Sequence, residues 1–270
     1  MKTLNKTLLA ATLVSGLSMA SSNAMAFPEF TIEEGALAGN GVNEFTADRI
    51  IGGYEELVTI TSLSAPGAGT FSTSLVWNAG SFSNTNVGPA SLPSQLGGFG
   101  AGYEMYALFL GTGSFTTDGT GRTNFAFATG TFSLYADLDQ DTGFTGTNGT
   151  VSYTRSGEGE DELLGSGDFL RGRGNQLCTA NNVNDCGSFG TATDFELTAL
   201  GEAYFIEPNP FYEVSLQSGN FNEIDLTQGV TTDVNGVMNV TFNVPEPASL
   251  ALMGLGFIGL GFAGRKQAKK

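Results

Sequence analysis

Residues 238–244 read Met-Asn-Val-Thr-Phe-Asn-Val, a strict alternation of apolar and polar side chains. Residues 132–138 (FSLYADL) and 195–199 (FELTA) alternate in the same way. Because successive side chains of a strand point to opposite faces, each stretch predicts a β-strand with one buried face. Further candidate strands, rich in β-branched and aromatic residues, occupy 55–62, 70–77, 103–110, 149–154 and 211–217.

Glycine and asparagine clusters separate these stretches, at 97–98, 148–149 and 235–236, and Asn-Gly favours tight hairpins. The body shows no ten-residue segment with helical periodicity and no fixed internal repeat. Many short strands with glycine-rich turns predict an all-β fold. We expect a single β-sandwich or jelly-roll domain of short antiparallel strands.

The composition excludes several classes of protein. The 270 residues include 39 Gly and no His, with 11 Lys or Arg against 27 Asp or Glu. Without imidazole there is no Ser-His-Asp triad, no Cys-His pair and no His-ligated metal. A net charge of −16 argues against a nucleic-acid partner, because phosphate neutralisation needs clustered Lys and Arg.

The first 26 residues have the three parts of a secretory signal peptide. Lys2 and Lys6 supply its positive start, and a mostly apolar stretch runs from Leu8 to Met19. Ala24 and Ala26 then form the small-x-small site at which signal peptidase cleaves. The sequence therefore predicts an N-terminal signal helix and an exported protein.

The other end of the chain carries a second signal. Pro245-Glu246-Pro247 precedes an apolar stretch from residue 249 to 263. This stretch predicts a transmembrane helix at the short limit for a bilayer core about 30 Å thick. The four cations that follow would keep that end in the cytoplasm and the body outside; they are Arg265, Lys266, Lys269 and Lys270.

This order of Pro-Glu-Pro, apolar helix and basic cluster resembles the PEP-CTERM sorting signal of exopolysaccharide-producing Gram-negative bacteria. The resemblance implies processing by an exosortase, a membrane-embedded transpeptidase, at or beside Pro245–Pro247. It also implies transient anchoring in the inner membrane and delivery to the cell surface or extracellular matrix. The body, with Phe27-Pro28-Glu29-Phe30 and the Asp-rich segment 137–142, is similar to flocculation-associated PEP-CTERM proteins.

The expected organisation is a signal peptide at 1–26, an exported β-sandwich domain at 27–244 and the sorting signal at 245–270. The exported domain holds five arginines, no lysine and 26 acidic residues, which gives a net charge of −21. Such a domain is well solvated and repels its copies unless divalent cations or sugars bridge them.

Cys178 and Cys186 are the two cysteines of the chain. Because an exported protein meets an oxidising compartment, we expect a local disulfide between them. No histidine is present to activate a free thiol.

Asp137, Asp139 and Asp141 alternate within a turn, which would direct three carboxylates toward one point, as Ca²⁺ requires. The segment is not an EF-hand loop, since Thr142 and Asn148 replace its glycine and its final glutamate. The alternatives are a looser calcium-binding turn and the solvated end of a strand.

The expected function is that of a non-enzymatic surface or matrix protein. It would promote cell aggregation, as flocculation or biofilm, together with exopolysaccharide. The alternatives are a secreted carbohydrate-active enzyme, since two carboxylates suffice for glycoside hydrolysis, and a calcium-dependent glycan-binding module. An ice-binding surface is a weaker alternative because the Thr-rich stretches have no repeat.

Overall fold

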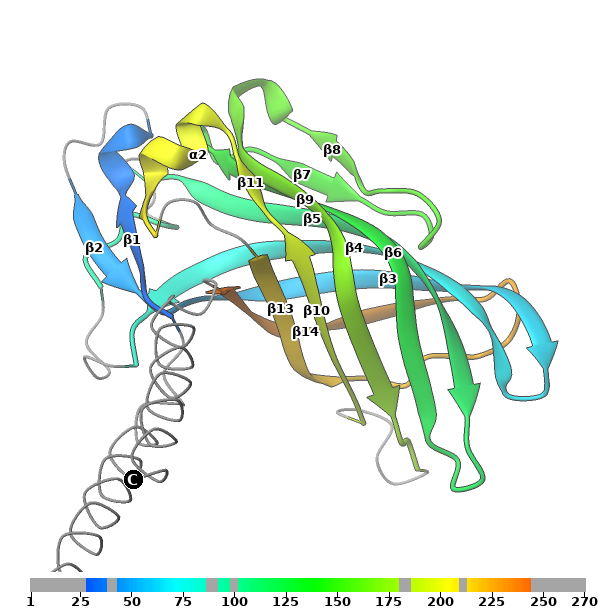
Figure 1. Ribbon diagram of the computed structural model, residues 1–270. Coiled ribbons are helices and arrows are strands. Elements are labelled where there is room, and N and C mark those ends of the chain that lie inside the picture. The colour runs from blue at the N-terminus through cyan, green and yellow to red at the C-terminus, as the bar shows by residue number, and fades with distance from the viewer. Residues whose placement is uncertain are drawn as a thin grey trace, which may run out of the picture.

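The expected sandwich is wrong, because the eight long strands form a closed antiparallel barrel (Figure 1). The computed structural model describes residues 28–37, 43–85, 92–97, 102–179, 186–208 and 213–243. The barrel strands are β3 (Arg49–Ala65), β4 (Ala68–Ser83), β5 (Glu104–Thr117), β6 (Thr123–Asp137), β9 (Asp161–Gln176), β10 (Gly187–Asp194), β13 (Glu213–Phe221) and β14 (Thr231–Asn243).

Each barrel strand pairs antiparallel with the next along the chain, and β14 returns to pair with β3. This is an up-and-down barrel, which has no open sheet edge. Alternation buries one face of a strand in a sandwich and in a barrel alike, so the pattern itself does not choose between them. The choice depends on the β3–β14 pairing, which joins residues 50–59 to residues 231–240.

The barrel interior is filled mainly by aromatic and aliphatic side chains. Trp77, Phe115 and Phe132 are at most 1% exposed, and many phenylalanine rings meet edge to face. Eight strands enclose a space that side chains can fill. A cavity of about 20 Å³ remains between Glu56 and the surrounding rings, enough for one water.

One end of the barrel is covered by a small sheet and a short helix. The sheet has the order β12 (Phe205–Glu207), β1 (Phe30–Glu33) and β2 (Glu44–Ala47). The 3-10 turn η1 (Glu34–Ala36) follows β1, and helix α2 (Ala199–Tyr204) follows the two-residue strand β11 (Glu196–Leu197). The strand predicted at 195–199 is therefore mostly absent, because Thr198 caps α2 by accepting a hydrogen bond from the Gly201 amide.

A hairpin of β7 (Gly143–Thr145) and β8 (Thr154–Ser156) lies against the outside of the barrel, followed by the turn η2 (Glu158–Glu160). The Gly149 amide donates to Thr59 Oγ1 of β3 at 2.8 Å, and Tyr153 is 7% exposed. We name residues 143–156 the outer hairpin. Gly149 also lies against the backbone of Ser72, an outward-facing residue of β4 that is buried.

The predicted signal helix and the predicted transmembrane helix both lie outside the described residues. Within the part of the chain that the structure describes, no helix is long and apolar enough to cross a membrane.

Candidate functional site

The structure brings the three predicted carboxylates together in the loop that follows β6. Asp137, the last residue of β6, is 1% exposed, whereas Asp139 and Asp141 are exposed. One carboxylate oxygen from each lies within 4.8 Å of the other two. Ligands on opposite sides of a Ca²⁺ ion are separated by about 5 Å, so this spacing is compatible with three of the oxygens that the ion needs.

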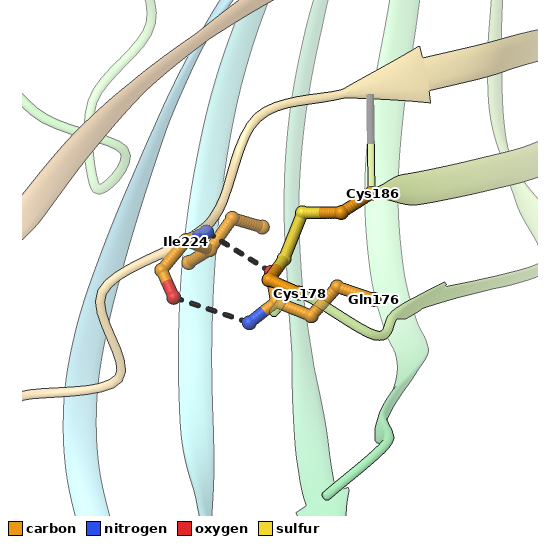
Figure 2. The surroundings of a disulfide bond; sticks show 4 residues. All are labelled: Gln176, Cys178, Cys186 and Ile224. Carbon is orange, nitrogen blue, oxygen red and sulfur yellow. Dashed lines mark hydrogen bonds between the residues drawn. A yellow bond between two sulfur atoms is a disulfide. The ribbon is translucent and has the colours of Figure 1, made fainter. Parts of the chain in front are cut away.

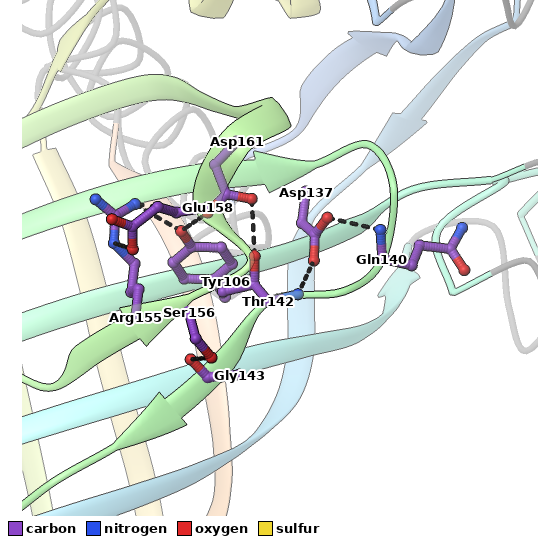
Figure 3. A network of polar contacts seen from close by, with 9 residues as sticks. All are labelled: Tyr106, Asp137, Gln140, Thr142, Gly143, Arg155, Ser156, Glu158 and Asp161. Atoms are coloured by element: carbon purple, nitrogen blue, oxygen red, sulfur yellow. Dashed lines mark hydrogen bonds and ion pairs between the residues drawn. The ribbon is translucent and has the colours of Figure 1, made fainter.

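Asp137 also sets the shape of the loop. Its carboxylate accepts hydrogen bonds from the amides of Gln140, at 2.7 Å, and Thr142, at 3.0 Å (Figure 3). Gln140 adopts a positive φ of 60°, which turns the chain back toward β7. The buried carboxylate therefore holds the two exposed carboxylates in place.

The pKa values of two carboxyl groups around this loop are raised above their ordinary values. The pKa of Asp139 is raised by desolvation, by its hydrogen bond with Asp137 and by the charge of Asp141. The pKa of Glu104 is raised by desolvation and by the charge of Asp137, its partner across the β5–β6 pair. Bringing like charges together costs free energy, which a bound cation would offset.

We name residues 137–142 the acidic loop. Next to it lies a polar network that the sequence did not predict. Arg155 Nη1 donates to the Tyr106 hydroxyl at 2.7 Å and lies 3.6 Å from Asp161 Oδ2 (Figure 3). Thr142 Oγ1 donates to Asp161 Oδ1 at 2.9 Å, which ties the acidic loop to β9. The one signal in the sequence was the weak alternation of β5, where Met105, Tyr106 and Ala107 are all buried.

The predicted disulfide is confirmed. Cys178 and Cys186 are bonded, with their Cα atoms 5.1 Å apart, at the end of the barrel opposite the small sheet. Beside the bond, the Gln176 amide group pairs with the backbone of Ile224, donating at 3.1 Å and accepting at 3.0 Å (Figure 2). The bridge closes the β9–β10 connection, and the Gln176 pair joins the end of β9 to the segment after β13.

Most of the deeply buried carboxylates lie away from the surface depressions that the structure describes. Glu34 accepts from Ser94 Oγ at 2.6 Å and from the Tyr103 hydroxyl at 2.9 Å, beneath the small sheet. Asp48 accepts from the Thr85 amide and lies 3.3 Å from Arg49. Neither side chain lines the depressions on the outer wall of β5 to β14 or the depression beside Cys178, where the acidic lining residues are Glu223 and Asp225.

The remaining predicted site residues fall outside the described part of the chain. These are the signal-cleavage residues Ala24 and Ala26, the motif Pro245-Glu246-Pro247 and the basic tail from Arg265 to Lys270. The structure places only the strand before the motif, since β14 ends at Asn243.

Comparison with known proteins identifies the C-terminal segment. Residues 243–267 match the PEP-CTERM protein-sorting motif. No curated protein and no solved structure matches the chain. This motif indicates an exported surface protein whose sorting depends on an exosortase.

Proposed function

We propose that the barrel is a non-enzymatic surface or matrix protein that promotes cell aggregation in association with exopolysaccharide. The observation that carries this proposal is the position of the sorting motif, which begins where β14 ends. The closed barrel is thus the part that sorting delivers to the cell exterior. Its charge of −21 supports a role among hydrated, charged polymers.

Loss of sorting tests this function. Cells that express the chain with Pro245→Ala, Glu246→Ala and Pro247→Ala should flocculate and retain exopolysaccharide less than cells with the unchanged protein. Gln267→Ala, at the last position of the motif match, is the matched control and should leave aggregation unchanged. Normal flocculation with the triple variant, or after deletion of the gene, would overturn the proposal.

We further propose that the acidic loop binds Ca²⁺ and so links the barrel to acidic polymers. The support is the convergence of Asp137, Asp139 and Asp141. Calorimetric titration of the protein with CaCl₂ should give saturable binding that Asp139→Asn with Asp141→Asn abolishes. Both side chains are exposed, so the fold should tolerate the change.

The control for the calcium experiment removes two other exposed carboxylates, by Asp168→Asn with Asp233→Asn. This variant has the same net charge as the Asp139→Asn, Asp141→Asn variant, and it should bind Ca²⁺ as the unchanged protein does. Equal binding by both double variants would show that Ca²⁺ associates with the acidic surface in general and would contradict a site at the loop.

A further inference from the structure

Two depressions on the outer wall of the barrel join into one polar face. The first lies over β5, β6, β9 and β10 and has a volume of about 470 Å³. The second lies over β9, β10, β13 and β14 and has a volume of about 560 Å³. Arg173 and Gly190 line both, so the face continues across six neighbouring strands of the wall (Figure 1). We name it the arginine face.

Strand register places small residues around a long one in the middle of this face. Arg173 of β9 pairs with Ala126 of β6 on one side and with Gly190 of β10 on the other. Ala126 pairs in turn with Ser114 of β5. Because the neighbours of Arg173 are short, the wall is hollowed on both sides of its side chain.

The arginine face concentrates the positive charge of an acidic protein. Of the five arginines in the exported domain, Arg171 and Arg173 line the depressions, and Arg122 donates to Asn175 Oδ1 of the first depression at 2.7 Å. The other two, Arg49 and Arg155, are paired with buried aspartates.

Acidic residues are excluded from the same face. Neither depression has an acidic lining residue, although the exported domain contains 26 acids. Glu213 lies outside both linings, where its carboxylate accepts hydrogen bonds from Nη1 and Nη2 of Arg171. Among the described residues Arg173 has no ion-pair partner and is exposed, so its guanidinium is open to an anion from solution.

The remaining lining groups suit a sugar. Amide and hydroxyl side chains both donate and accept hydrogen bonds, as sugar hydroxyls do; they include Thr116, Asn124, Asn175, Ser188 and Gln217. A guanidinium binds a carboxylate through two parallel hydrogen bonds. At physiological salt, charges beyond about 8 Å are largely screened, so the acids elsewhere on the barrel do not prevent local binding.

We propose that the arginine face binds an anionic polysaccharide whose sugars carry carboxylates, with Arg173 contacting a carboxylate, Arg171 adding positive charge beside it and the amides contacting the hydroxyls. This inference rests on the proposed association with exopolysaccharide and names the chemical class of the polymer. A chain lying across six strands would contact both depressions at once.

The test is binding of the mature protein, purified from the cells that export it, to polygalacturonate at 0.15 M NaCl with EDTA present. EDTA removes any contribution from the acidic loop. We expect saturable binding, at least tenfold tighter than to neutral dextran. Arg171→Gln with Arg173→Gln should weaken it tenfold to a hundredfold, since the variant removes the charged hydrogen bonds of Arg173 and both positive charges.

Two further variants separate charge from fold. Ser64→Glu with Val151→Glu changes the net charge by the same amount at exposed positions away from the face and should bind normally. Gly190→Gln fills the shared floor without changing charge. The fold can accept this change, because the nearest atoms to an added Cβ are 3.8 Å away. The variant should weaken binding, because the added side chain occupies the space that the polysaccharide would fill.

Three results would overturn the inference: no binding of polygalacturonate by the unchanged protein, equal binding by the double arginine variant, or equal loss with the charge control. Equal affinity for anionic phospholipid vesicles would also overturn it, in favour of a membrane surface. These outcomes do not depend on the flocculation assay. Normal binding with unchanged flocculation after gene deletion would instead refute the proposed function and leave the arginine face in place.

Discussion

Glu56 is a carboxyl group enclosed by the barrel and surrounded by phenylalanine rings. Its side chain accepts a hydrogen bond from Thr73 at 2.5 Å, and no cation of the described chain pairs with it. Burial raises its pKa from 4.5 to about 7, although the hydrogen bond from Thr73 lowers it. The folded protein therefore holds a proton on Glu56 that the unfolded chain releases above pH 4.5.

This pKa shift predicts a pH dependence of stability. Between pH 4.5 and 7 the unfolded state binds fewer protons at this position than the folded state, so the Glu56 contribution to the free energy of unfolding falls as pH rises. Above pH 7 the loss is complete and amounts to about 3 kcal/mol. Glu56→Gln should therefore be more stable than the unchanged protein at pH 8, and the two should converge near pH 4.5.

Urea unfolding at several pH values measures this difference. Glu55→Gln is the control, because Glu55 is the exposed neighbour on the same strand. A stability difference between Glu56→Gln and the unchanged protein that stays constant from pH 4.5 to 8 would contradict the buried-carboxyl account.

At the scale of elements, the outer hairpin depends on the close approach of Gly149 to the barrel wall. A Cβ on this residue would lie 2.3 Å from the carbonyl oxygens of both Leu57 and Ser72. The hairpin buries the Tyr153 ring and begins directly after the acidic loop. Its docking and the geometry of the loop are therefore coupled through residues 141–143.

Gly149→Ala should release the outer hairpin while leaving the barrel folded. Amide hydrogen exchange in residues 143–156 should become at least tenfold faster, and exchange in β5 should stay unchanged. Gly119→Ala is the control, since nothing lies within 4 Å of a Cβ at that position. Unchanged exchange in the hairpin would show that this contact does not hold it.

The sequence predicted several strands and the turn at 148–149, because their information is local. The turn predicted at 235–236 is wrong, since Asn235 and Gly236 continue β14 and pair with β3. The alternation at 238–244 and 132–138 corresponds to β14 and β6, and the aspartates at 137–141 converge. The strand predicted at 149–154 is wrong except at its last residue, since β8 begins at Thr154 and a turn stands at the start of the segment. There the Asn148 side chain accepts from the Thr150 amide at 2.8 Å and stabilises a turn.

Closure of the barrel and the arginine face could not be predicted, because both depend on pairing between distant strands. Gly52 and Gly53 interrupt the pattern of β3, yet the strand continues through them. A Cβ on Gly52 would lie 2.1 Å from the Asn78 carbonyl oxygen, so glycine permits the irregular register there. Arg122 reaches the hydrogen bond with Asn175 of β9 only once β6 and β9 are paired.

At the scale of the whole molecule, the first and last described strands meet at one end of the barrel. The ring centroids of Phe30 in β1 and Phe242 in β14 are 4.7 Å apart. β14 therefore finishes at the end of the barrel covered by the small sheet, and its last residue, Asn243, is the first residue of the motif match (Figure 1). The acidic loop follows β6 at this same end, because β6 and β14 both finish here.

The central claim is that this barrel is exported and processed by an exosortase at its sorting motif. Mass spectrometry of the mature protein, from cells with and without the exosortase gene, tests it most directly. We predict a chain that starts at Phe27 and ends at or beside Pro245–Pro247 only when the enzyme is present. Recovery of the same unprocessed C-terminus, through Lys270, from both kinds of cell would contradict it.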